Sequence, residues 1–61
     1  MSNLSEKELA SLGELLSGEE LLVKKFKMLA ENATDENVKC EMERISARHQ
    51  EHFNQLYNHL S

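Results

Sequence analysis

Three side chains of this 61-residue chain combine types and spacing that could do chemistry. His49 and His52 lie three residues apart, so on a helix they share one face and can both reach one metal ion. Glu19 could add a carboxylate from a second helix. Such a group could bind a transition metal, or it could form a buried hydrogen-bonded pair that fixes how two helices pack.

Other reactive side chains lack partners of the required type. Cys40 is the only cysteine, which excludes a disulfide within one chain, and we expect it to be a half-exposed thiol. His59 lies near the C-terminus, where we expect it to be exposed. The sequence has no Ser/His/Asp arrangement and no phosphate-binding glycine loop. It therefore predicts no catalytic or cofactor-binding residues, and a metal site only at Glu19, His49 and His52.

Two helices must position these residues. Ser5, with Glu8 three residues later, forms a capping box and predicts a first helix over about 5–32. The segment 32–35 interrupts the apolar periodicity, and Thr34 is a good N-cap for a second helix over about 35–60. The first helix repeats apolar residues at helical spacing: Leu9, Leu12, Leu16, Val23, Phe26 and Ala30, flanked by Leu15, Leu22 and Leu29. The second does so with Val38, Met42, Ile45, Phe53, Leu56 and Leu60.

Gly18 is the weak point of the first helix, because glycine costs about 1 kcal/mol relative to alanine in a helix interior. Ser17 and Glu20 could also form a second capping box, with a kink or restart between them. We expect one continuous helix.

The hairpin geometry brings the three candidate residues together. At about 100° per residue, Glu19 falls near the centre of the first helix's apolar arc. His49 falls inside the arc of the second helix, and His52 toward its edge. Residues 38, 42, 45, 49, 52 and 56 of the second helix then form a heptad stripe, which we expect to contact the first helix and call the seam. Two long helices joined by a short turn pack antiparallel, so residues whose numbers sum to about 67 or 68 lie level, and Glu19 comes level with His49.

Composition limits the partners and the location. The net charge of −4 argues against nucleic acid and against anionic membrane surfaces. No apolar run approaches the roughly 20 residues of a membrane-spanning helix, and Met1–Lys7 has no signal-peptide pattern. We therefore expect a cytoplasmic protein.

Size predicts self-association. A single 61-residue domain buries only about 60% of its unfolded surface and usually needs a metal or a partner. Both apolar arcs are wider than one partner helix can cover. We expect an all-α, two-helix antiparallel hairpin that forms a four-helix bundle as a homodimer.

Two segments resemble a known family. Glu19–Phe26 (EELLVKKF) and Arg48–Phe53 (RHQEHF) are similar to the small spore coat protein F-like family, a branch of the ferritin-like group. The resemblance covers about residues 4–60. It implies a ferritin-like half-bundle in which a first-helix Glu and a second-helix Glu-x-x-His motif reach a di-iron centre.

The chain departs from that pattern at one position. His49 stands where the motif has its second-helix Glu, and an imidazole has one free nitrogen and cannot bridge two irons as a carboxylate does. This difference favours a mononuclear site, with zinc or iron as candidate metals, or no metal at all.

Three functions follow from these features. We favour a non-enzymatic, self-associating helical protein, similar to a spore coat component, made in the cytoplasm and deposited on the spore coat with other coat proteins. The alternative is a ferritin-like metal-binding or redox protein that uses Glu19, His49 and His52. A third is an adaptor whose apolar face receives helices of another protein.

Overall fold

The first helix begins at a cap that its own sequence supplies. The Ser5 side chain accepts a hydrogen bond from the backbone N–H of Glu8, and the Glu8 carboxylate accepts one from the backbone N–H of Ser5. These bonds satisfy two donors that a helix start otherwise leaves unpaired. In the computed structural model, which describes residues 4–60, helix α1 then runs over Glu6–Asn32 without interruption at Gly18. The ends of the predicted domain, residues 1–3 and 61, lie outside the described range.

The second helix and its N-cap each begin one residue later than predicted. Asp35, not Thr34, is the N-cap of α2 (Glu36–Tyr57), and its Oδ1 accepts a hydrogen bond of 3.0 Å from the backbone N–H of Val38. An aspartate carboxylate also interacts favourably with the positive end of the helix dipole. Asn58–Leu60 form a 3-10 turn, η1, so the α-helix ends before the predicted residue 60.

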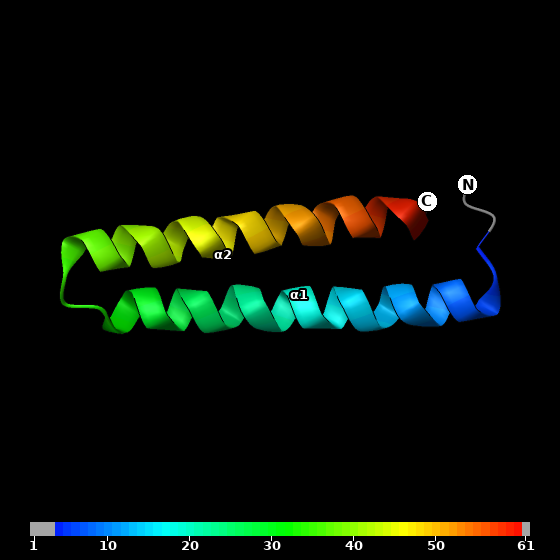
Figure 1. The fold of residues 1–61 in the computed structure, drawn as a ribbon, viewed down its shortest axis with the longest axis horizontal. Helices are drawn as coiled ribbons and strands as arrows, with labels where there is room; N and C mark the ends of the chain where they lie inside the picture. Colours follow the sequence, from blue (N-terminus) through cyan, green and yellow to red (C-terminus); the bar gives the residue numbers. More distant parts are fainter. Residues whose placement is uncertain (1–3, 61) are drawn as a thin grey trace.

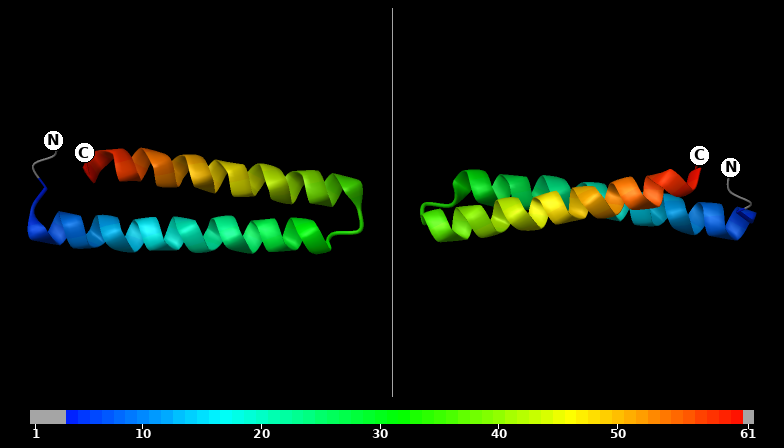
Figure 2. Two further views of the ribbon diagram at one scale, coloured as in Figure 1. Left: turned by 180° about the vertical axis from the view of Figure 1, so that it is seen from behind. Right: turned by 90° about the horizontal axis from the view of Figure 1, so that it is seen from above.

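The two helices lie side by side and antiparallel, with the turn at one end and both described chain ends at the other (Figures 1 and 2). The Cα trace measures 46 × 15 × 10 Å. Residues 4–60 contain no strand, so the predicted all-α hairpin is confirmed.

The contact between the helices differs from the predicted seam on α2. Leu12, Val23 and Ala30 of α1 are buried as expected, but the buried residue of α2 is Ser46. Ile45 is half-buried and Val38 is exposed, so α2 is rotated away from the predicted 38–45–52 stripe. Ser46 makes this rotation favourable because its hydroxyl donates a 3.0 Å hydrogen bond to the Val23 carbonyl oxygen. Leu9, which belongs to the apolar repeat of the first helix, is exposed.

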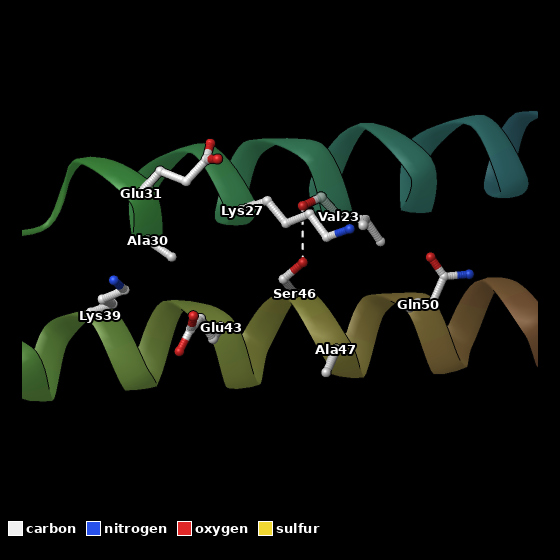
Figure 3. A pocket seen from close by; sticks show the side chains of 9 residues that line it. All are labelled: Val23, Lys27, Ala30, Glu31, Lys39, Glu43, Ser46, Ala47 and Gln50. Atoms are coloured by element: carbon white, nitrogen blue, oxygen red, sulfur yellow. Dashed lines mark hydrogen bonds between the residues drawn. The ribbon is translucent and has the colours of Figure 1, made fainter.

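One side of the hairpin is polar. A groove between the helices there has Val23, Ala30 and Ser46 at its base (Figure 3). Its rim carries charges of both signs, Lys27 and Glu31 on α1 and Lys39 and Glu43 on α2.

The opposite side is apolar. Helical spacing puts Leu15, Leu22 and Leu29, seven residues apart, on the side of α1 that faces away from Lys27. The same spacing puts Val38 and Ile45 on that side of α2. We call this surface the apolar face; it consists of Leu15, Leu22, Phe26, Leu29, Val38 and Ile45, all exposed or half-buried.

Within the described residues, neither helix is both long and apolar enough to cross a membrane.

Candidate functional site

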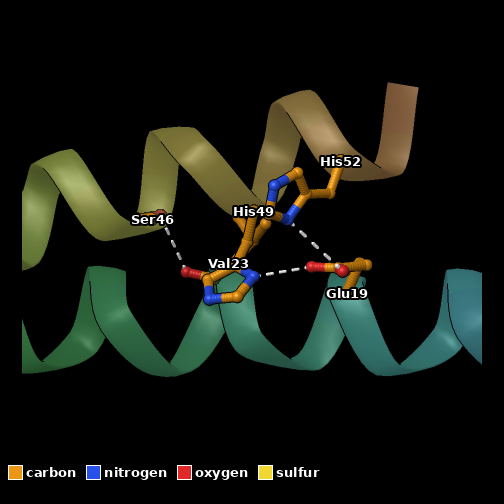
Figure 4. A network of polar contacts seen from close by, with 5 residues as sticks. All are labelled: Glu19, Val23, Ser46, His49 and His52. Carbon is orange, nitrogen blue, oxygen red and sulfur yellow. Dashed lines mark hydrogen bonds and ion pairs between the residues drawn. The ribbon is translucent and has the colours of Figure 1, made fainter. Parts of the chain in front are cut away.

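Glu19 and His49 form the central contact between the helices. The Nδ1 atom of His49 lies 2.6 Å from Oε1 of Glu19 (Figure 4). A carboxylate only accepts, so Nδ1 carries the hydrogen and donates it. Both side chains retain about a fifth of their exposure, 20% for Glu19 and 22% for His49. This bond is charge-assisted and partly shielded from water, which makes it stronger than a surface pair.

His52 joins the pair from one turn further along α2. Its Nδ1 lies 3.5 Å from Oε2 of Glu19, a longer and weaker contact, and its side chain is 45% exposed. The two imidazoles meet edge to face, with ring centroids 5.6 Å apart. Glu19 therefore uses one carboxylate oxygen for each histidine, and the pair with His49 is the tighter one.

Neighbouring side chains hold the His49 ring in position. Phe26 stacks on it with a centroid distance of 5.8 Å and an interplanar angle of 16°. Ser46, one turn earlier on the same face of α2, holds the backbone of α1 at Val23 (Figure 4). The stack on Phe26 thus limits the rotation of the His49 ring, and the Ser46–Val23 hydrogen bond limits the sliding of the helices.

The donor set suits a single metal ion better than a pair. Glu19, His49 and His52 each offer one ligand atom, and these atoms lie within 4.8 Å of one another. Two imidazoles and a carboxylate are a common set for zinc or ferrous iron. Within one chain the group lacks the second carboxylate that would bridge two metals.

Metal binding would change this geometry. Tetrahedral ligands about 2.0–2.2 Å from a zinc ion are roughly 3.4 Å apart. The 2.6 Å separation between Glu19 and His49 is that of a hydrogen bond, so the two groups would have to move apart to admit an ion. The site can therefore serve either as a hydrogen-bonded pair or as a ligand set, and the two uses compete.

The structure brings together the three residues singled out from the sequence, while their metal role stays a prediction. Cys40 is exposed and, like His59, takes no part in the cluster. Ser46 was not identified from the sequence as a contact residue between the helices. The available signal was its position, because it is a polar residue three positions before His49 in an otherwise apolar stripe.

Comparison with protein-family models, with curated proteins and with solved structures found no match to this chain. The similarity to spore coat protein F-like proteins therefore rests on the two segments quoted above.

Proposed function

We propose that this chain is a non-enzymatic, self-associating helical protein whose unit is a homodimeric four-helix bundle. The observation that carries this proposal is the apolar face. Leu15, Leu29 and Val38 are exposed there in a single hairpin. Contiguous exposed apolar surface of this kind is unfavourable in water and typical of an interaction site.

A second hairpin would supply the core that one hairpin lacks. Only Leu12, Val23 and Ala30 are buried hydrophobic residues in the described part of the chain. Burying further apolar area contributes roughly 25 cal/mol per Å². Pairing two apolar faces extends this core, and it also encloses Glu19 and His49 between four helices.

The biological setting of the proposal rests on the resemblance in Glu19–Phe26 and Arg48–Phe53. A small helical bundle made in the cytoplasm and deposited on the spore coat, in contact with other coat proteins, fits that resemblance. The exposed charges of both helices give such a unit a polar outer surface. We assign it no reaction.

Sedimentation equilibrium tests self-association directly. We expect a mass of twice 7.0 kDa at micromolar concentration. Leu29→Glu introduces a charge into the apolar face, where Leu29 is 44% exposed, and should shift the protein toward monomer. Leu21→Glu is the matched control, because Leu21 is 67% exposed and helical spacing puts it on the side of α1 that faces away from α2, outside the apolar face. This change should leave the mass unchanged. A folded 7.0 kDa wild-type monomer would refute the proposal.

The second candidate function is ferritin-like metal binding, with or without redox chemistry. Its specific support is the convergence of Glu19, His49 and His52. Titration calorimetry with zinc and, under anaerobic conditions, with ferrous iron tests it. Each of Glu19→Gln, His49→Gln and His52→Gln should abolish specific binding, and His59→Gln should not. Equal weak binding by all four variants and the wild type would leave only the structural role for the cluster.

A further inference from the structure

The groove on the polar side of the hairpin is large enough to hold a small molecule. Its volume is about 440 Å³, and small-molecule sites typically measure about 300–1,000 Å³. Val23 and Ala30 give its floor an apolar surface, which Ala47 extends along α2 (Figure 3). The Ser46 hydroxyl already donates its hydrogen to the Val23 carbonyl oxygen. A molecule that covers this floor must therefore bring apolar surface of its own.

The groove continues along the hairpin toward the chain ends. A second hollow of about 260 Å³ shares three lining residues with the first, Val23, Lys27 and Gln50. It ends at Phe53, whose half-buried ring adds apolar surface. Together the two hollows follow residues 20–31 of α1, about 16 Å at a rise of about 1.5 Å per residue. The groove is thus long and narrow, which suits an extended chain.

Two lysines bring positive charge to the first hollow. Lys27 lines it from α1 and Lys39 from α2, and Lys39 is half-buried. Figure 3 shows both amino groups reaching toward the gap between the helices, whereas the carboxylates of Glu31 and Glu43 lie over their own helices. Within residues 4–60, the ion pairs involve neither lysine. An anionic group in this hollow would gain two charge-assisted contacts that the hairpin itself leaves unmade.

We propose that this groove binds a single-chain alkyl carboxylate. The carboxylate lies between Lys27 and Lys39, and the alkyl chain follows the floor past Val23 toward Phe53. An uncharged chain of the same length would cover the floor but leave both amino groups without an anionic partner. The groove and the apolar face are on opposite sides of the hairpin, so the groove stays open in the proposed dimer. Binding of this ligand therefore does not depend on self-association.

Titration with decanoate tests the ligand class, and decanol and decylammonium are the matched probes with the same alkyl chain. Each probe is added below its micelle concentration to the full chain, and backbone amide shifts are followed by NMR. We expect decanoate to shift the signals of the groove residues Ala47 and Gln50 and to leave those of Leu22 and Leu29, on the apolar face, unchanged. Decanol and decylammonium should shift the groove signals less, because neither pairs with an ammonium group.

Lys27→Gln and Lys39→Gln each remove one ammonium group. Each change should weaken decanoate binding about threefold to fivefold, and the two together about tenfold or more. Lys25→Gln is the matched control and should keep the wild-type affinity, because helical spacing puts Lys25 on a different side of α1 from the groove. No decanoate binding at millimolar concentration, equal binding of decanol, unchanged affinity in the double variant, or shifts confined to the apolar face would each overturn the proposal.

Discussion

Glu19 binds the two histidines unequally, and this difference should appear in stability. His49 gives the 2.6 Å hydrogen bond and the ring stack on Phe26, whereas His52 makes the longer contact from a more exposed position. We expect Glu19→Gln and His49→Gln each to lower the free energy of unfolding by about 1–3 kcal/mol. His52→Gln should cost less. Urea unfolding of the three variants measures this order, and an equal loss for both histidines would contradict it.

Ser46 is small and polar at a buried position between the two helices. It is 3% exposed and donates to the Val23 carbonyl oxygen. Ser46→Ala should lower the free energy of unfolding by about 1 kcal/mol, the usual net worth of one hydrogen bond. Ser46→Leu should cost more, about 1–3 kcal/mol, because the larger side chain forces the helices apart. If leucine instead stabilised the protein, the rotation of α2 described above would be wrong.

At the scale of the helix, the cap of α1 should be sensitive to pH. The hydrogen bond from the Ser5 backbone N–H, followed by that with the Ser5 side chain, lowers the pKa of Glu8. A carboxyl whose folded-state pKa is lowered stabilises the fold above its unfolded pKa, and this contribution is lost as pH falls through the folded value. An NMR titration of the Glu8 carboxyl should therefore have a midpoint below the ordinary glutamate value. Ser5→Ala should raise that midpoint, and no change would contradict the side-chain part of the cap.

Continuity of α1 through Gly18 gives a second prediction at this scale. Neither glycine has a positive φ, and a Cβ at either Gly13 or Gly18 meets nothing within 4 Å. Gly18→Ala should therefore stabilise the protein by about 0.5–1 kcal/mol through helix propensity. Gly13→Ala is the matched control and should give a similar gain. Thermal unfolding measures both, and a loss confined to Gly18→Ala would indicate a break in the helix.

At the scale of the whole molecule, folding and association should be linked. If the apolar face is covered by a second copy, the dimer is the stable folded form, and Tm should rise with protein concentration by mass action. Circular dichroism melts over a hundredfold range of concentration measure this effect. Leu29→Glu should lower Tm, whereas Leu21→Glu should keep the wild-type dependence on concentration. A Tm that is independent of concentration would mean that the single hairpin is stable alone.

Local sequence determined the hairpin. Ser5 with Glu8 marked the start of α1, and the loss of apolar periodicity after Asn32 marked the turn. Both are local effects, because caps and helical spacing act over a few residues. The sequence also predicted that Glu19 and His49 lie at the same height along the hairpin. Two antiparallel helices with the same rise per residue and a known turn have a known register.

Tertiary structure decided the choices that local rules leave equal. Thr34 and Asp35 are both competent N-caps, and the path of the turn selected Asp35. The apolar arc of α2 is wide enough to pack in several rotations. Ser46 selected one of them, because a small hydroxyl side chain allows close contact and finds its acceptor on α1. That partner is 23 residues away in the chain, so its contribution depends on how the two helices pack.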